Sequence, residues 1–338
     1  MKLNKTAWSV SSAAVIIAAL IFCRPFNAGA QKTVPLIYVS NERDGTITVI
    51  NTKTDQVVST IRIGGRPRGI QLSPDGRTLY VALSRSLRAT SSDVTDQIAA
   101  LDPVSGKVKA SYSVGPDPEQ FAVSQDGARL YVTNEDAGTA TITDLRTRRV
   151  LATLVVGTEP EGVAISPDGR WVYVTSETSN IISVIDTRAQ RVSLNFPVDP
   201  RPRAAAFSSD GTRAFVTSEN GGTVMVIDAR RHQVIQTIPR PDNAARPMGI
   251  VVSRDGRTIY VANGRGNNVS VIDGQTYQLR ELIPTGARPW GIALTPNGKK
   301  LYTANGLSND VSVIDTATRC VIATIRAGDG PWGIAVRG

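Results

Sequence analysis

Histidine and cysteine are nearly absent from this chain of 338 residues, which has one histidine and two cysteines. The single histidine, His232, cannot form a histidine-rich zinc site, and no Cys/His cluster accompanies it. The sequence shows no Ser-His-Asp set either, and we expect His232 to be solvated near the outer edge of the repeat described below. No phosphate-binding or dinucleotide-binding glycine motif precedes a helix. We therefore predict no catalytic set, no metal site and no cofactor, although calcium sites built from oxygen ligands alone stay open.

Long apolar runs are also scarce, and the one at residues 13–22 lies close to the N-terminus. Lysines precede this run, and a small-residue Ala-Gly-Ala motif follows it at residues 28–30. This order is typical of a secretory signal peptide. We expect residues 1–30 to be such a peptide, cut near Ala30, with export of the protein to the periplasm or out of the cell.

Two alternatives for the N-terminus are an uncleaved anchor and a lipoprotein attached through Cys23, which the bulky Phe22 before it disfavours. After cleavage, residues 31–338 would form a single domain without a membrane span, because no further apolar stretch is long enough. That domain keeps one cysteine, Cys320, so it cannot form a disulfide within the chain. Loss of the leader lowers the formal net charge from +9 to +6, which is only a weak indication of an anionic partner.

A unit of about 42 residues recurs seven times after the leader. Each unit opens on a proline, continues with an apolar run, a turn of the Ser-Pro-Asp-Gly type and a Tyr-Val-Thr-Asn-like run, and ends with two more β-rich runs. The opening prolines are Pro67, Pro118, Pro160, Pro202, Pro247, Pro289 and Pro331. Their spacings are 51, 42, 42, 45, 42 and 42 residues, and the two longer ones come from the Leu83–Gln97 loop and from Pro239–Arg246.

Four short β-rich runs per unit predict a four-stranded antiparallel sheet, and this period is typical of a propeller blade. We therefore predict an all-β, seven-bladed β-propeller with four antiparallel strands per blade. The first unit starts in its second strand, Leu36–Ser40, and the chain ends in a first strand, Pro331–Val336. We expect these two strands to pair and to close the ring, which leaves no open sheet edge between the ends.

Several unit-specific motifs carry a resemblance to a known family. They are GPDPE (115–119), EPEGVAISPDG (159–169), TSETSN (175–180), RPRAAAFSSDG (201–211) and NGLSNDVSVID (305–315), with PWGIAV at the C-terminus. With them the chain resembles the YVTN-repeat β-propellers, in particular a subgroup associated with PQQ-dependent alcohol catabolism, over nearly the whole mature chain. The resemblance implies an exported protein that accompanies a transport system and quinoprotein dehydrogenases, and it implies no known reaction. The Leu83–Gln97 loop is longer than its equivalents, so a partner contact there would be peculiar to this chain.

Two columns of the repeat have a structural interpretation. An aromatic column recurs in every unit and is expected to pack between blades. Its members are Tyr38, Tyr80, Tyr131, Tyr173, Phe215, Tyr260 and Tyr302. An acidic column ends the third strand and is expected to close a turn through its own side chains rather than to catalyse. It consists of Asn51, Asp102, Asp144, Asp186, Asp228, Asp273 and Asp315.

The position after each opening proline varies from unit to unit, unlike a scaffold position. It reads Arg68, Glu119, Glu161, Arg203, Met248, Trp290 and Trp332, and Arg66 precedes the first of these prolines. A neighbouring column just past the second strand adds Glu42, Glu135, Glu177 and Glu219. Both columns lie in loops on the same face of a propeller, and loops on a rigid scaffold are where binding sites usually lie. We predict that these residues form a binding site for a ligand or partner at the channel mouth.

Three functions and one structural explanation compete for this mouth. The preferred function is a non-catalytic binding or accessory propeller, whose partner is a small organic ligand or a periplasmic protein such as a quinoprotein dehydrogenase or transport component. The second is a lactonase-like hydrolase propeller, for which Glu119, Glu161 or Glu177 would be the general base. The third, binding of a polyanion such as nucleic acid, is disfavoured because an acidic sector interrupts the arginines. Alternatively, neighbouring Arg and Glu side chains simply pair at the surface, which would stabilise the fold by about 0–1 kcal/mol per pair.

Overall fold

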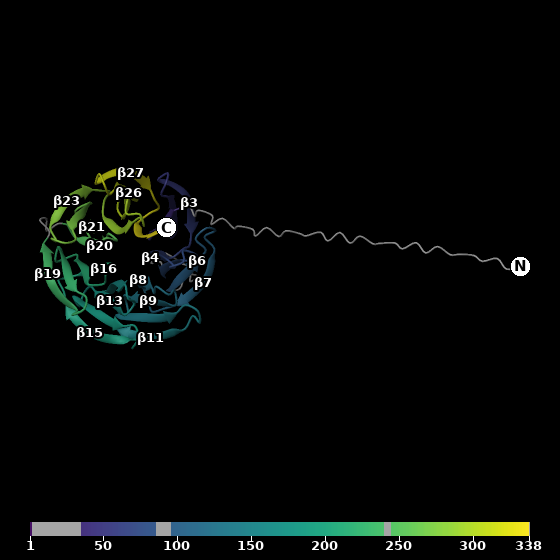
Figure 1. The fold of residues 1–338 in the computed structure, drawn as a ribbon, viewed down its shortest axis with the longest axis horizontal. Helices are drawn as coiled ribbons and strands as arrows, with labels where there is room; N and C mark the ends of the chain where they lie inside the picture. Colours follow the sequence, from purple (N-terminus) through teal and green to yellow (C-terminus); the bar gives the residue numbers. More distant parts are fainter. Residues whose placement is uncertain (2–34, 86–95, 240–244, 338) are drawn as a thin grey trace. The chain divides into compact units, whose positions relative to one another are not determined.

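A computed structural model describes residue 1 and residues 35–85, 96–239 and 245–337. Within these ranges the chain forms 28 strands in seven antiparallel sheets of four strands each, and it contains no helix (Figure 1). The predicted signal peptide lies outside the described residues, as do most of the Leu83–Gln97 loop and most of Pro239–Arg246. No stretch of the described residues is a helix with the length and apolar character needed to cross a membrane.

The strands of each blade are given from the innermost to the outermost. The first three blades are β28 (Pro331–Val336), β1 (Leu36–Asn41), β2 (Thr46–Asn51) and β3 (Gln56–Arg62); β4 (Arg66–Leu72), β5 (Leu79–Ser84), β6 (Gln97–Leu101) and β7 (Val108–Ser113); and β8 (Pro118–Val123), β9 (Arg129–Asn134), β10 (Thr139–Asp144) and β11 (Val150–Val155). The next two are β12 (Pro160–Ile165), β13 (Trp171–Ser176), β14 (Ile181–Asp186) and β15 (Arg191–Pro197); and β16 (Pro202–Phe207), β17 (Arg213–Ser218), β18 (Thr223–Asp228) and β19 (Gln233–Pro239). The last two are β20 (Pro247–Val252), β21 (Thr258–Asn263), β22 (Asn268–Asp273) and β23 (Leu279–Pro284); and β24 (Pro289–Leu294), β25 (Lys300–Asn305), β26 (Asp310–Asp315) and β27 (Cys320–Arg326).

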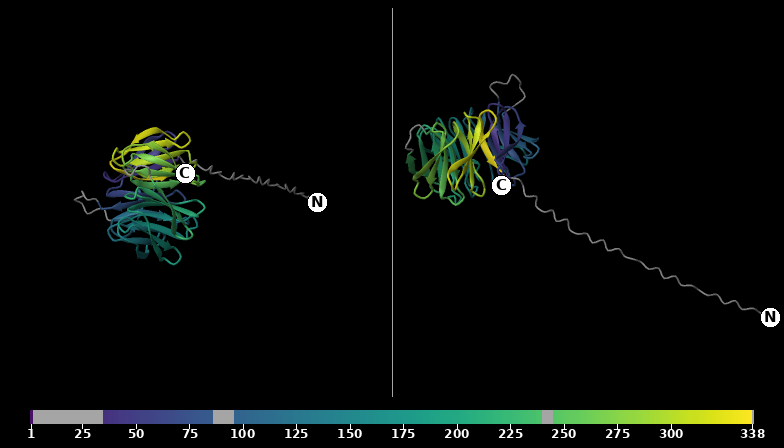
Figure 2. Two further views of the ribbon diagram at one scale, coloured as in Figure 1. Left: turned by 90° about the vertical axis from the view of Figure 1, so that its left-hand side faces the viewer. Right: turned by 90° about the horizontal axis from the view of Figure 1, so that it is seen from above.

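The blades are arranged radially, and the strands that begin at or beside the repeat prolines lie innermost (Figures 1 and 2). Ring closure follows the sequence prediction, because β28 pairs antiparallel with β1 in the register Ile37↔Val336 and Tyr38↔Ala335. The seven-bladed propeller predicted from the repeat is therefore confirmed.

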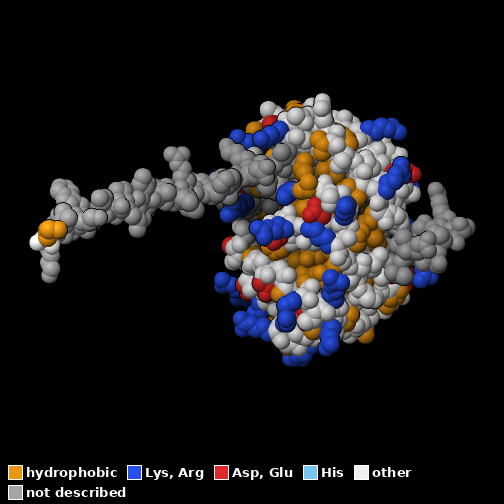
Figure 3. All heavy atoms as spheres, turned by 90° about the vertical axis from the view of Figure 1, so that its right-hand side faces the viewer, with side chains coloured by type: hydrophobic (Ala, Val, Ile, Leu, Met, Phe, Trp, Pro, Cys, Tyr) orange, Lys and Arg blue, Asp and Glu red, His pale blue; other side chains and the backbone are white. Residues whose placement is uncertain are grey.

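The core lies between adjacent blades rather than inside one sheet. The two middle strands of each blade are buried on both faces, whereas the outermost strands are largely exposed. One core cluster, for example, packs Tyr173 and Val184 of one blade against Ala214 and Val216 of the next. All seven residues of the aromatic column are buried, which confirms their packing role. On the rim, hydrophobic and basic side chains are interspersed at the surface (Figure 3).

The aspartate column also behaves as predicted. Asp186 Oδ1, for example, accepts hydrogen bonds from the backbone N–H groups of Arg188 and Ala189 at 2.9 and 3.0 Å. These backbone bonds hold the pKa of the Asp186 carboxyl below its usual value. The column is therefore a set of turn-closing side chains.

The expectation that His232 is solvated is wrong. Its side chain is buried, its Nδ1 lies 2.7 Å from the hydroxyl of Tyr173, and its ring packs edge-on against Trp171. The turn after β18 brings His232 back against the neighbouring blade, and its backbone has a φ of 55°. A position that the repeat places in an outer turn is therefore part of a contact between two blades.

Candidate functional site

The mouth of the central channel is built from two loops in each blade, as the two sequence columns predict. One loop enters the innermost strand and the other follows the second strand. They are joined by a backbone hydrogen bond in which the residue before the proline is the acceptor: Glu177 N–H donates to Glu159 O, and Glu219 N–H donates to Arg201 O, both at 2.8 Å. Glu159 and Arg201 have positive φ values of 52° and 61°, which is uncommon for side-chain-bearing residues. The loop geometry thus places each glutamate of the second column beside the first column.

One charged network surrounds Arg203, which is only 7% exposed. Its guanidinium contacts Glu161 and lies 2.5 Å from Glu177 Oε2 and 2.7 Å from Glu219 Oε2. Arg201 contacts two of the same carboxylates, Glu177 at 2.6 Å and Glu219 at 2.9 Å. These residues come from β12, from β16, from the loop before β16 and from the loops after β13 and β17. The prediction of surface pairing is wrong in one respect, because Arg203, Glu161 and Glu177 are buried.

A second network surrounds Arg68, which is also buried. Its guanidinium contacts Glu119, lies 2.9 Å from Glu42 Oε1 and lies 3.3 Å from Glu135 Oε2. Glu42 also binds Arg66 at 2.7 Å. This network joins β4 and β8 across the blade boundary in the same way as the Arg203 network joins β12 and β16.

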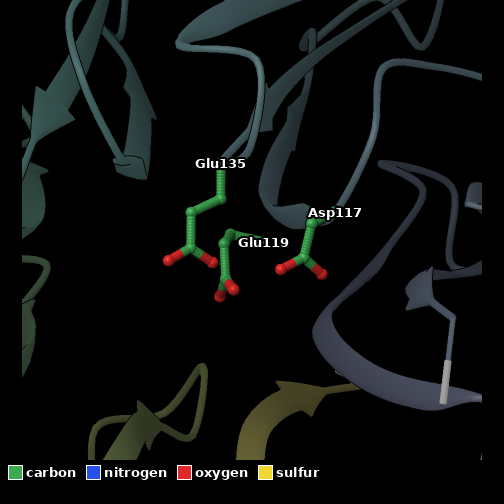
Figure 4. Close-up of side chains that lie close together, drawn as sticks. All are labelled: Asp117, Glu119 and Glu135. Atoms are coloured by element: carbon green, nitrogen blue, oxygen red, sulfur yellow. The ribbon is translucent and has the colours of Figure 1, made fainter. Parts of the chain in front are cut away.

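Three carboxylates of this second network could offer ligands to a metal ion. Oxygen atoms of Asp117, Glu119 and Glu135 lie within 4.8 Å of one another, and the three side chains converge in Figure 4. However, the Arg68 guanidinium already contacts Glu119 and lies within 3.3 and 3.6 Å of the other two. A divalent cation would have to displace this fixed positive charge, so the site does not favour a metal.

The glutamates of the mouth differ in their proton affinity. Burial raises the pKa of Glu177 to about 8, and the neighbouring Glu161 adds to this effect against the opposing charge of Arg203. Burial and the charge of Glu161 also raise the pKa of Glu135 to about 7. Burial acts on Glu219 as well, but Arg203 and Arg201 outweigh it and hold its pKa below the usual value. At neutral pH the Glu177 carboxyl is therefore mainly protonated, that of Glu219 is ionised and that of Glu135 is about half ionised.

The apolar residues of the mouth meet the Arg203 network at the channel. Trp290 and Trp332 have ring centroids 5.9 Å apart, and the guanidinium carbon of Arg203 lies 5.4 Å from the centre of the Trp290 ring. Both tryptophans line a channel cavity of about 190 Å³ together with Glu161, Arg203 and Met248. A buried carboxylate, a guanidinium and two indoles thus face one enclosed space, which is the usual make-up of a small-molecule site.

A second and larger cavity, of about 710 Å³, adjoins the first and shares Arg203 and Met248 with it. Of the predicted site residues, this cavity also contains Glu219. Glu177 contacts Arg203 but lines neither cavity. Glu119, Glu135, Arg66 and Arg68 do not line either cavity and belong to the Arg68 network. The mouth therefore contains one set of predicted residues in or beside the cavities and another in a compact salt-bridge cluster.

Four arginines of the larger cavity were not among the predicted site residues: Arg201, Arg246, Arg265 and Arg288. Arg201, Arg246 and Arg288 precede repeat prolines, so the column that contains Arg66 could have identified them. Arg265 lies two residues beyond β21, in a turn whose composition gives no such signal.

Two family models match parts of the chain. The model of the choice-of-anchor I domain matches residues 28–198, and that of the lactonase family, described as a seven-bladed β-propeller, matches residues 189–321. No curated protein matches the chain. Solved structures share the fold at low sequence identity.

The periplasmic gluconolactonase of Pseudomonas aeruginosa is 21% identical, with a TM-score of 0.73 over 90% of this chain and 99% of its own. A candidate 6-phosphogluconolactonase from Bacteroides fragilis is 21% identical, with a TM-score of 0.74 over 91% of this chain and 99% of its own. The hydrazine synthase of Kuenenia stuttgartiensis is 23% identical, with a TM-score of 0.70 over 80% of this chain and 89% of its own.

These matches correct the preferred functional interpretation of the sequence. A non-catalytic binding or accessory propeller linked to PQQ-dependent alcohol catabolism is not supported, because the lactonase model and the solved lactonases favour the hydrolase alternative. The protein partners implied by the resemblance stay a prediction.

Proposed function

Because the chain belongs to the choice-of-anchor I domain family and its later blades match the lactonase model, we propose that this protein is an exported lactone hydrolase. Its reaction would be the addition of water to a lactone, which opens the ring and gives a hydroxy acid. The site would be the channel mouth around Arg203, with the lactone against Trp290 and Trp332.

The observation that carries this proposal is the contrast in proton affinity among the glutamates around Arg203. Hydrolysis of an ester bond needs one group that accepts a proton from water and another that donates a proton to the leaving oxygen. Carboxyl groups whose surroundings push their pKa values apart can fill these two roles at one pH. Glu177, with a pKa of about 8, remains protonated at neutral pH, whereas Arg203 and Arg201 hold the pKa of Glu219 below its usual value, so that Glu219 is ionised.

The proposed steps use these groups in order. A carboxylate that lines the cavities, Glu161 or Glu219, removes a proton from water, and the resulting hydroxide oxygen bonds to the lactone carbonyl carbon. The Arg203 guanidinium stabilises the negative charge that develops on the carbonyl oxygen. The bond between this carbon and the ring oxygen then breaks, and the ring oxygen takes the proton of the Glu177 carboxyl. The proton that the base took from water returns to Glu177, and the hydroxy acid leaves as a carboxylate after releasing its own proton to water.

Burial of the mouth strengthens each of these interactions. Glu161, Glu177 and Arg203 are each less than a tenth exposed, so their charges act in surroundings of low polarity. Trp290 and Trp332 provide a flat apolar wall beside them. The ring of a lactone has a polar carbonyl edge and a less polar face, which matches this combination of groups.

The proposal is tested by measuring acid release from simple lactones, such as glucono-δ-lactone, at constant pH. We expect the protein to accelerate this release above the spontaneous rate, and Glu177→Gln to reduce kcat by about 100-fold or more, the usual contribution of a general acid. Glu281→Gln is a matched control, because Glu281 is a half-exposed residue of the outermost strand β23. A protein without activity on any lactone, or a Glu177→Gln variant as active as the parent, would contradict the proposal.

Export to the periplasm is part of the proposed function. It is supported by the order of basic, apolar and small residues in positions 1–30 and is compatible with the periplasmic gluconolactonase of the same fold. N-terminal sequencing of the protein from the cell envelope should begin at or near Gln31. A protein found in the cytoplasm with Met1 intact would contradict this part.

A further inference from the structure

Two of the four arginines that precede repeat prolines have glutamate partners in this mouth. Arg201 pairs with Glu219 of its own blade at 2.9 Å, and Arg66 pairs with Glu42 of the preceding blade at 2.7 Å. Each of these glutamates is the first residue after the second strand of its blade. The repeat thus combines an arginine in one loop with a carboxylate in the other.

The blades β20–β23 and β24–β27 keep the arginine and lose the carboxylate. Arg246 and Arg288 precede the prolines of these blades, but the residues after their second strands are Gly264 and Gly306. The loop geometry is unchanged, since Gly264 N–H donates to Arg246 O at 2.8 Å and Gly306 N–H donates to Arg288 O at 2.9 Å. Only the acidic side chain is missing.

The larger cavity opens beside Gly264, at one of the two positions that lack the acidic side chain. Its volume is about 710 Å³, and Arg246, Arg288 and Gly264 line it together with Arg265. In the part of the chain that the structure describes, none of these three arginines forms an ion pair with a carboxylate, whereas Arg201 on the same wall does. Three guanidinium groups therefore line one cavity without forming ion pairs among the described residues, because the one carboxylate of the lining, Glu219, is bound by Arg201 and Arg203 and acts on Arg246 only from a distance.

Two of these guanidinium groups are held in place by uncharged partners. Arg246 donates a hydrogen bond to Asn220 Oδ1, and the Arg288 guanidinium carbon lies 4.9 Å from the centre of the Trp290 ring. Trp290 and Met248 connect this wall to the channel cavity, where the proposed reaction takes place. Asn220 and Trp290 orient these cations without neutralising them, which leaves the cations available to a ligand.

We propose that the cavity binds the anionic group of a small molecule, a phosphate or a carboxylate, in place of the missing glutamates. Arginine suits this role because its planar guanidinium can bind such groups through two parallel hydrogen bonds. As a statement about the substrate, the inference rests on the proposed hydrolysis: the preferred lactone carries an anionic substituent, which lies among Arg246, Arg265 and Arg288 while the ring lies beside Trp290. Neutral lactones then lack the interaction that the three arginines offer.

The experiment compares direct binding and turnover with the same set of variants. Calorimetry measures binding of 6-phosphogluconate, gluconate and inorganic phosphate, and acid release measures turnover of a neutral and a phosphorylated lactone. Arg246→Gln and Arg288→Gln remove one charge each. Gly264→Glu restores the missing carboxylate; a Cβ atom there would lie 3.0 Å from Met248 Cγ, a flexible side chain that can move. Arg254→Gln is the control, because Arg254 is an exposed arginine in a Ser-Arg-Asp-Gly turn before β21.

We expect each arginine variant and Gly264→Glu to weaken binding of the preferred anion at least tenfold, with Arg254→Gln unchanged. Tighter binding of 6-phosphogluconate than of gluconate identifies a phosphate as the anion, and the reverse order identifies a carboxylate. Binding that is equal in all variants, or as tight for the neutral lactone as for the anions, would overturn the inference. If the arginine variants bind the anion as tightly as the parent while Glu177→Gln abolishes turnover, this inference is wrong and the proposed hydrolysis still holds. If anion binding depends on the arginines but the protein hydrolyses no lactone, the proposed hydrolysis is wrong and this inference still holds.

Discussion

The hydroxyl of Tyr302 donates a 2.9 Å hydrogen bond to Oδ1 of Asp55, across the boundary where the last blade meets the blade closed by the C-terminal strand. Lys300 Nζ lies 2.6 Å from the other carboxylate oxygen of Asp55, and Tyr302 itself is fully buried. The same type of contact joins other blades, since Tyr38 donates to Pro103 O at 2.9 Å and Tyr173 meets His232 at 2.7 Å. The tyrosine column is thus a set of polar links between blades as well as a packing column.

Removal of the Asp55 carboxylate should weaken the closing boundary of the ring. Asp55→Ala leaves the buried hydroxyl of Tyr302 without its acceptor, and an unsatisfied buried group of this kind costs about 1–3 kcal/mol. Urea unfolding should show this loss in the free energy of unfolding. If Asp55 acts through Tyr302, the double variant Asp55→Ala/Tyr302→Phe should lose less than the sum of the single variants. Strictly additive losses would show that the two residues act independently.

Closure itself depends on the C-terminal strand β28. Deletion of residues 331–338 removes the innermost strand of the first blade and exposes the edge of β1, which is prone to pairing with other molecules. We expect a lower Tm and concentration-dependent aggregation in light scattering. A truncated protein that is monomeric and as stable as the full chain would show that pairing of β28 with β1 contributes little.

The buried position of His232 should make stability fall in mild acid. Burial lowers the pKa of this histidine below 6.5, against the attraction of Asp228 and with the help of Arg170. The unfolded state therefore binds a proton more readily than the folded state. The stability from neutral His232 is fully present above about pH 6.5 and decreases as the pH falls below that value, by at most about 1.4 kcal/mol per pH unit. Unfolding experiments between pH 7 and pH 5 should show this loss for the parent protein and a smaller one for His232→Gln.

The sequence predicted the fold well because every blade repeats the same physical constraints. Proline begins the innermost strand, the aspartate column closes a turn, and aromatic residues pack between blades. Each of these patterns is a weak signal in one blade, but each recurs in seven blades. Contacts between blades were harder to predict, since they depend on the direction of side chains rather than on their position in the repeat. His232 lies in an outer turn but points into the neighbouring blade, and Glu161 lies at the start of β12 but is buried beside Arg203. The loss of glutamate at Gly264 is visible in the sequence, but its meaning depends on the loop contact with Arg246.

Activity should depend on pH through the Glu177 carboxyl of the mouth. If Glu177 donates its proton to the leaving oxygen, kcat/KM falls as Glu177 ionises near pH 8. Glu177→Gln should remove this alkaline fall from the residual activity. A kcat/KM that is constant between pH 6 and pH 9 would contradict this role of Glu177.

Glu177 should also lower the free energy of unfolding as the pH rises. Its pKa is raised from 4.5 in the unfolded chain to about 8, so the folded state holds a proton that the unfolded state has released over this range. Its contribution therefore becomes increasingly unfavourable as the pH rises from about 4.5 to 8. Glu177→Gln removes this penalty, and we expect a free energy of unfolding higher by about 1 kcal/mol at pH 8 together with lost activity. A variant that is less stable than the parent at pH 8 would indicate that the ion pairs with Arg201 and Arg203 dominate.

Variants of the motif Glu159-Pro160-Glu161-Gly162 can distinguish a structural role of the channel mouth from a functional one. Glu161 lines the channel cavity with Trp290, so Glu161→Gln and Trp290→Ala should each reduce kcat/KM for the preferred lactone about tenfold or more, as expected when a contact to a charged group or an aromatic wall is lost. Asp168→Asn is the control, because Asp168 closes the Ser-Pro-Asp-Gly turn of the same blade through a 2.5 Å bond from Ser166. This control should change stability and leave kcat/KM as it is. If the mouth variants hydrolyse the lactone as fast as the parent while their Tm falls, then Glu161 serves only to anchor Arg203, and the reaction must take place elsewhere on the propeller.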